Sequence, residues 1–160
     1  MVNYAEWVKS KPIQDYLKDN NCYGCGALNS SGLLIKSYWD GEDQAVCFFK
    51  PENYFCAGHP SVVNGGLIAT VVDCHCVSLA TAKDYSIQYG KASLTDLSVS
   101  HVTASLKIDF IEPTPLDDNT SLVFLAKIRN VENRKTLIDC TVLANGNVTA
   151  KAEVLDIKII

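Results

Sequence analysis

The chain has 160 residues, of which 48% are hydrophobic and 20% are charged, and its formal net charge is -4. This length predicts one domain with a sizeable core, and the lack of any Lys/Arg run argues against a nucleic-acid partner. Neither an export signal nor eighteen successive apolar residues are found, so we expect a cytoplasmic protein that does not bind membranes.

Residues 1–20 predict a helical extension, and residues 21–160 predict the main domain. The apolar side chains of the extension follow helical spacing in two groups, and Pro12 suits the first position of a second helix. The pattern therefore predicts two short amphipathic helices that cap the domain. The residues with this spacing are Tyr4, Trp7, Val8, Ile13, Tyr16 and Leu17.

Seven cysteines are an odd number in a chain without an export signal, so we expect reduced thiols that serve as small core residues. Cys22 and Cys25 form a Cys-x-x-Cys pair, but a structural zinc site needs four ligands and no second pair follows. Cys74, His75 and Cys76 point about 100° apart on a helix and cannot all meet one metal. The sequence therefore predicts no metal site.

Residues 33–40 and 44–49 are apolar, aromatic-rich runs separated by Asp40-Gly41-Glu42-Asp43, which predicts a hairpin. Residues 52–63 then predict an irregular loop. His59 in this loop is a candidate substrate contact, although a single loop histidine is more often only solvated.

Residues 62–82 contain the predicted central helix, which opens at two glycines and carries apolar residues at helical spacing. Asn64 is a favourable N-cap. The next two amides, of Gly65 and Gly66, carry no side chain and lie at the positive end of the helix dipole. They are therefore candidates to bind a developing oxyanion.

Asp73 follows along this helix, flanked by Val71, Val72 and Cys74. A carboxylate among apolar residues is costly to bury unless it has partners or a task. Two explanations stay open, a structural pairing inside a dimer and a role in catalysis.

After the helix, residues 83–100 are polar and predict a long loop, either a functional lid or a disordered excursion. Residues 102–110 alternate between apolar and polar side chains, which predicts a half-buried strand that ends before Pro113. Residues 121–131, 135–144 and 148–160 predict three more strands. In the last one the apolar pattern slips by one residue, which predicts a bulge at Val154-Leu155.

Two strands, one helix and four strands predict an α+β fold in which an antiparallel sheet of about six strands wraps around one central helix. Asn64-Gly65-Gly66, six further residues and Asp73 resemble the His-Gly-Gly-x6-Asp/Glu signature of PaaI-type hotdog acyl-CoA thioesterases. The Cys-x-x-Cys-Gly stretch and the strand before Pro113 are also similar to that family. The resemblance covers about residues 22–160 and implies the hotdog fold.

The resemblance also implies an activity, the hydrolysis of an acyl-CoA thioester to free acid and CoA without metal or redox cofactor. The Gly65 amide would bind the carbonyl oxygen, Asp73 would be nucleophile or general base, and Thr103 would hold the attacking water. Thr103 is equally well read as an ordinary solvent-facing strand residue. Asn64, where the family usually has His, is expected to contact substrate together with Gly66 and His59.

The family's active site lies between two subunits, with Gly65 of one facing Asp73 of the other. The resemblance therefore implies a homodimer, or a homotetramer of two dimers. The polar loop of residues 83–100 would lie near the substrate entrance and help to select the acyl group. Candidate basic residues for CoA are Lys83, Lys91, Lys107, Lys127, Arg129, Arg134 and Lys135.

Two alternatives remain. A non-catalytic acyl-CoA-binding or regulatory hotdog protein is favoured by the replacement of His with Asn64. A hydratase or dehydratase acting on an acyl thioester would need an Asp/His pair, and neither His75 nor His101 lies in such a motif.

Overall fold

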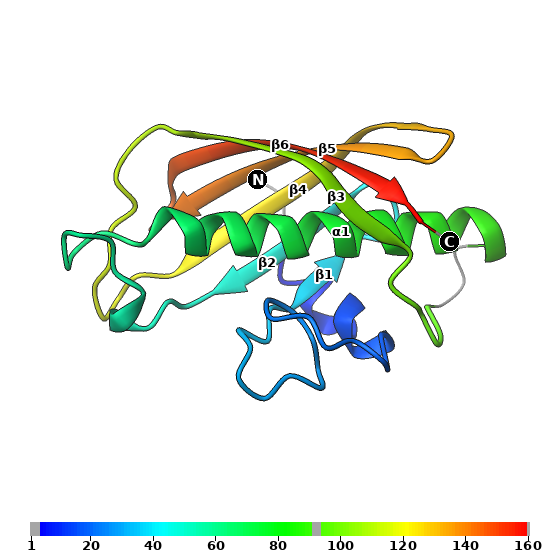
Figure 1. Cartoon of the computed structure of the whole chain (residues 1–160), viewed down its shortest axis with the longest axis horizontal. Helices are drawn as coiled ribbons and strands as arrows, with labels where there is room; N and C mark the ends of the chain where they lie inside the picture. Colours follow the sequence, from blue (N-terminus) through cyan, green and yellow to red (C-terminus); the bar gives the residue numbers. More distant parts are fainter. Residues whose placement is uncertain (1–3, 91–93, 160) are drawn as a thin grey trace.

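The computed structural model describes residues 4–90 and 94–159. One six-stranded antiparallel sheet, in the order β1-β2-β4-β5-β6-β3, curves around a single long helix (Figure 1). This is the architecture predicted from the sequence. The strands are β1 (Ser37–Trp39), β2 (Gln44–Phe49), β3 (His101–Phe110), β4 (Leu122–Glu132), β5 (Lys135–Ala144) and β6 (Asn147–Lys158); the helix is α1 (Gly65–Tyr89), and 3-10 turns span Trp7–Lys9, Ile13–Tyr16 and Asn53–Phe55.

Helix α1 begins where the sequence predicts, because the side chain of Asn64 accepts hydrogen bonds from two amides of the first turn, those of Gly66 and Leu67. The helix is apolar on most sides and lies against the sheet, so most of it is buried. By length and composition α1 would also suit a membrane span. However, 67% of its most apolar 18-residue stretch is buried inside the protein, as expected of a core helix.

The helix is longer than predicted. It continues through Tyr89, and Gly90 ends it with a φ of 84°. The prediction of a loop from residue 83 onward is therefore wrong for residues 83–89. Their polar side chains lie on a helix and have partners there, since Asp84 accepts from Gln88 and pairs with Lys158. Lys91 lies outside the described residues.

The first strand is shorter than the predicted run of residues 33–40. The backbone before β1 pairs with the cysteine-rich loop and not with the sheet, since the Leu33 amide donates to Tyr23 and the Ile35 amide donates to Gly24. Leu34 between them has a φ of 53°, which no extended strand allows. This departure places the cysteine-rich loop beside α1.

The predicted bulge at Val154-Leu155 is also wrong. Ala152, Val154 and Asp156 are buried in unbroken alternation along β6. The pairing between β3 and β6 shifts instead on β3, between Thr103 and Ser105. A second shift in the pairing of β6 lies opposite Val142 and Leu143 of β5. The apparent slip in the sequence arises because a buried position of β6 carries a carboxylate.

The N-terminal extension packs as 3-10 turns in place of the two short amphipathic helices predicted. Ile13 and Leu17 pack against Ala82 of α1 and Leu97. Gln14 is fully buried and links the extension to β1 and α1. Its Nε2 lies 2.8 Å from Ser37 Oγ and 2.9 Å from Ser78 Oγ, and its Oε1 accepts from the Ser37 amide at 2.7 Å.

Candidate active site

A carboxylate of α1 faces a cavity. Asp73 lines a cavity of about 350 Å³ together with His101, Thr103 and the cysteines of the N-terminal loop. The hydroxyl of Thr103 donates a hydrogen bond to Asp73 Oδ1. Thr103 is therefore not an ordinary solvent-facing strand residue, because it points from β3 toward the helix.

A second carboxylate lies on the other side of the same hydroxyl. Thr103 Oγ1 is 3.1 Å from Oδ1 of Asp156, which is fully buried on β6. A hydroxyl has one hydrogen and donates to only one carboxylate at a time. Both contacts are satisfied when Asp156 carries a proton and donates to Thr103 while Thr103 donates to Asp73.

The surroundings of Asp156 favour its protonated form. Burial, together with the smaller effect of the nearby charge of Asp73, raises the pKa of Asp156 to about 7. Asp156 Oδ2 is buried and has no hydrogen-bond partner among the residues that the structure describes. An ionised carboxylate left in this way is costly, whereas a neutral carboxyl is much less so.

Strand pairing brings the three residues together. Thr103 of β3 is directly opposite Asp156 of β6, next to the register shift between Thr103 and Ser105. This shift turns Thr103 inward, on the side of the partly buried Leu106, although the sequence pattern places these two residues on opposite faces.

The start of α1 forms a separate region. Gly65 lines a second cavity of about 450 Å³ with Ile68, Phe110 and Ile111. The Gly66 amide, one of the two candidates for oxyanion binding, already donates to Asn64 Oδ1 at 2.8 Å. The Gly65 amide has no hydrogen-bond partner in the part of the chain that the structure describes.

Gly65 and Asp73 are far apart in one protomer. Asp73 follows Gly65 by eight residues of the same helix, and at 1.5 Å per residue this separates them by about 12 Å along the axis. A reacting carbonyl must lie about 3 Å from both its oxyanion donor and its nucleophile. One protomer therefore cannot use both groups on the same carbonyl.

Comparison with known proteins gives a consistent assignment, although no family model matches the chain. Acyl-coenzyme A thioesterase THEM4 of Rattus norvegicus is 29% identical over 112 residues, or 70% of this chain. A thioesterase superfamily protein of Shewanella loihica PV-4 is 29% identical, with a TM-score of 0.61, over 79% of this chain and 91% of that one. The PaaI protein of the E. coli phenylacetic acid degradation operon is 17% identical, with a TM-score of 0.59, over 79% and 78% of the two chains.

The chain resembles PaaI-type hotdog thioesterases in fold, and it is similar in sequence to two proteins named as thioesterases. An uncharacterized protein of Pyrococcus horikoshii shares the fold over 94% of this chain and 95% of its own, with a TM-score of 0.65 and 15% identity. The chain spans only 41% of the length of the rat thioesterase.

Of the histidines in this hotdog fold, His59 is exposed and His101 is buried. His59 is exposed in the loop before α1, where its Nδ1 contacts Ser61 Oγ at 2.8 Å, and it borders neither cavity. Its proposed contact with substrate stays a prediction. His101 was not selected from the sequence as a site residue, but it is buried and lines the cavity beside Asp73. Burial lowers its pKa, so the ring is neutral near pH 7.

The third histidine, His75 of α1, is structural. His75 is fully buried, with Nδ1 2.8 Å from Ser37 Oγ and Nε2 3.2 Å from the Ala45 carbonyl oxygen. Burial lowers the pKa of His75 to about 4, so this ring is neutral at physiological pH. Its two hydrogen bonds tie the helix to β1 and β2.

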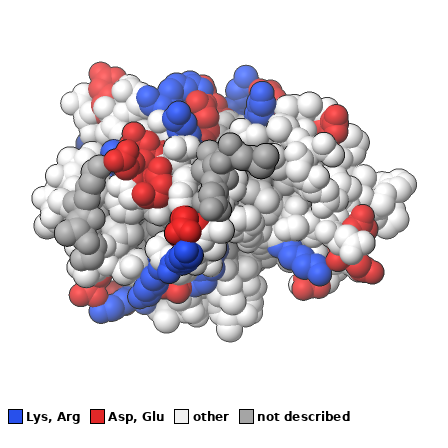
Figure 2. Space-filling model, turned by 180° about the vertical axis from the view of Figure 1, so that it is seen from behind, with Lys and Arg blue, Asp and Glu red and all other residues white. Residues whose placement is uncertain are grey.

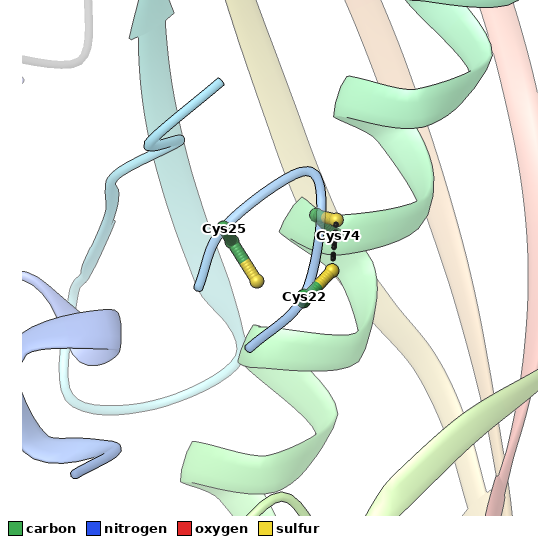
Figure 3. A group of neighbouring side chains, drawn as sticks. All are labelled: Cys22, Cys25 and Cys74. Carbon is green, nitrogen blue, oxygen red and sulfur yellow. Dashed lines mark hydrogen bonds between the residues drawn. The ribbon is translucent and has the colours of Figure 1, made fainter. Parts of the chain in front are cut away.

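Three cysteines that are far apart in sequence meet beside the cavity. Cys22 and Cys25 lie on the N-terminal loop and Cys74 on α1, and the three side chains point toward one another (Figure 3). Cys22 Sγ is 3.5 Å from Cys74 Sγ. Adjacent residues of a helix point in different directions, but one of them, Cys74, still joins the Cys-x-x-Cys pair from another part of the chain. The sequence alone did not predict this grouping.

The thiols of this group influence one another. A hydrogen bond from Cys74 lowers the pKa of Cys25, and the same contact together with burial raises the pKa of Cys74. The side-chain amide of Asn20 also donates to Cys25 Sγ at 3.4 Å. These contacts thus favour the thiolate of Cys25 and disfavour that of Cys74.

Among the residues that the structure describes, no Lys or Arg lines either cavity. On the face opposite to that of Figure 1, Lys and Arg are interspersed with Asp and Glu (Figure 2). Arg129 pairs with both Asp139 and Glu153, and Lys83 pairs with Asp43. The candidate CoA-binding residues therefore already have acidic partners in several cases.

Proposed function

We propose that the protein hydrolyses an acyl-CoA thioester to the free acid and CoA. The observation that carries this proposal is the placement of Asp73, whose carboxylate borders a cavity and is held by the hydroxyl of Thr103. The similarity to the rat acyl-coenzyme A thioesterase and to the Shewanella loihica thioesterase superfamily protein supports the same chemistry. The rest of the proposal concerns which groups act on the thioester.

Asp73 activates water or attacks the carbonyl carbon itself. The Thr103 hydroxyl donates to Oδ1 of Asp73. Oδ2 of Asp73 has no hydrogen-bond partner among the described residues, so it is available to act on water or on the thioester. In the water route, Oδ2 takes a proton as the water oxygen bonds to the carbonyl carbon, and the C–S bond then breaks. The proton then passes to the departing CoA thiolate. Water thus supplies both the oxygen of the acid and the proton of the thiol, and no cofactor is needed.

Thr103 and Asp156 position this carboxylate. With a proton on Asp156, the hydrogen of Thr103 is directed at Asp73, and the orientation of the carboxylate is fixed. Once Asp156 is ionised, two carboxylates compete for that one hydrogen. Asp156 is thus a positioning residue that acts through Thr103.

The oxyanion donor comes from a second protomer. Within one chain the Gly65 amide lies about 12 Å from Asp73, too far for one carbonyl. Strand β3 is an edge of the sheet and carries exposed apolar side chains near its ends, with Val102 45% and Phe110 54% exposed. An edge of this kind favours pairing with a second copy. We place the catalytic unit in a homodimer, with a tetramer of two dimers as its possible assembly.

The cavity beside Asp73 also indicates the kind of acyl group. Leu17, Val77 and Val99 contribute apolar surface to it, while His101 and Ser78 contribute the polar part. A site lined in this way suits an apolar acyl chain or ring with a carbonyl at one end.

Thiol release from short, medium, long-chain and aromatic acyl-CoAs tests this function. The wild type should hydrolyse one class, Asp73→Asn should lose about 10²-fold or more in kcat, and the exposed Asp109→Asn serves as the matched control. Acyl-CoA binding without hydrolysis would instead identify a binding protein. Addition of water to an enoyl-CoA without thiol release would identify a hydratase.

A further inference from the structure

We propose that Cys22, Cys25 and Cys74 bind one zinc ion through three thiolates, with the fourth coordination position open to the cavity beside Asp73. The proposal rests on the cysteine cluster and holds whether or not the protein hydrolyses thioesters. The zinc ion would be additional to the proposed thioester hydrolysis, which needs no metal.

The distances between the sulfur atoms suit a single metal ion. All three Sγ atoms lie within 4.8 Å of one another, and Cys22 Sγ is 3.5 Å from Cys74 Sγ. Zinc binds thiolate at about 2.3 Å in a tetrahedron, which separates two sulfur ligands by about 3.8 Å. Small side-chain movements therefore bring the three sulfurs to equal distances from one ion.

The loop is built around these sulfurs. Gly24 lies so close to α1 that a Cβ atom there would be 2.3 Å from Cys74 Sγ. A Cβ on Gly26 would lie 2.4 Å from the Cys22 backbone nitrogen. Glycine is therefore required at both positions, and the backbone curls tightly around the ligand set.

Hydrogen bonds to sulfur complete the environment. The Gly24 amide is 3.3 Å from Cys22 Sγ, and the amide of the buried Asn20 is 3.4 Å from Cys25 Sγ. Donors of this kind offset the charge of metal-bound thiolates and fix their orientation. They are outer-shell partners such as a zinc site normally has.

The ligand set also indicates which metal binds and what it does. Three thiolates select a soft or borderline ion such as zinc over magnesium or calcium. Among the described residues no His, Asp or Glu joins the three cysteines, so the fourth ligand is water or a small molecule from the cavity. The ion would fasten the loop to α1 and fix one wall of the site that contains Asp73.

Metal analysis of the purified, reduced full chain tests the proposal. The wild type should contain about one zinc per chain, and Cys22→Ser and Cys74→Ser should lose at least about nine tenths of it. Cys56→Ser is the matched control, since Cys56 lies outside the cluster, and it should keep its zinc. Cys22 is exposed, so Cys22→Ser removes a ligand without opening the core.

Replacement of zinc by cobalt gives a second readout that does not depend on activity. Cobalt bound to the wild type should show strong thiolate-to-metal charge-transfer absorption, which Cys22→Ser should lose while circular dichroism shows that it is folded. The proposal is overturned if the reduced wild type contains no more zinc than Cys22→Ser. It is also overturned if the metal-free wild type takes up no cobalt, or forms a Cys22–Cys74 disulfide as its stable state.

Discussion

Thr103 lies between two carboxylates, with its hydroxyl donating to Asp73 and 3.1 Å from Oδ1 of Asp156. The single hydrogen of the hydroxyl links the protonation of one acid to the orientation of the other. Asp156 is buried and the partly buried Asp73 borders the cavity, so the buried acid acts on the acid at the cavity through a strand residue. The first two predictions follow from this relationship.

Removal of the Thr103 hydroxyl should reduce turnover more than substrate binding. Thr103→Val keeps the shape of the side chain but leaves Asp73 without its donor, and we expect kcat to fall by about 10²-fold. Steady-state kinetics with the preferred acyl-CoA measures kcat and KM separately. Thr103→Ser restores the hydroxyl and should recover most of the loss; equal activity of the Val variant and wild type would remove Thr103 from the site.

Asp156 should make the folded protein less stable as pH rises. Its pKa is about 7 in the folded state and about 3.9 in an unfolded chain, so the folded state holds the proton more tightly between these values. Its contribution to the free energy of unfolding is then lost progressively from about pH 4 to pH 7, by about 4 kcal/mol in total. Urea unfolding of wild type and Asp156→Asn across this range measures the difference. A difference that does not change with pH would contradict the buried, protonated state.

His75 should have the opposite effect at acidic pH. Burial lowers its pKa to about 4 from about 6.5, so an unfolded chain binds the proton first. The stability that the neutral ring provides is complete above pH 6.5 and is lost as pH falls through 4, by about 3 kcal/mol. His75→Gln should show a smaller loss between pH 7 and pH 4 in the same unfolding assay. An unchanged pH dependence would show that this histidine is not buried in neutral form.

The sequence predicted the parts of the fold that depend on local pattern. Strand β5 has the predicted bounds of residues 135–144, because its apolar alternation is regular and Asn145-Gly146 ends it. The start of α1 at Asn64 was predicted for a similar reason, since capping is a local interaction. The end of the helix was missed because residues 83–89 are polar, and their partners lie on other elements.

The parts of the site that depend on contacts across the fold were less predictable. Asp156 was missed because it follows Ala152 and Val154 at the next buried position of β6, where an apolar residue is expected. The change in the apolar pattern was interpreted as a bulge. A carboxylate at a position that the alternation buries was the signal that could have identified Asp156. Cys74 was excluded together with its neighbours on the helix, because the sequence does not show that the N-terminal loop folds over α1.

The most direct test of a site shared by two protomers combines two inactive variants. Gly65→Pro removes the amide at the first helical position, where proline is tolerated, and Asn64 before it already has the extended ψ of 129° that proline requires. Gly65→Ala is its control, because alanine adds a Cβ near Phe110 but keeps the amide. The second inactive variant is Asp73→Asn.

The two variants are co-expressed with different tags, and the mixed dimer is purified through both. One of its two sites then combines an intact Gly65 with an intact Asp73, so we expect about half the activity of the wild-type dimer. Each parent dimer should be inactive. A mixed dimer as inactive as its parents, or an active Gly65→Pro parent, would contradict a thioesterase site built from the Gly65 amide of one protomer and Asp73 of the other.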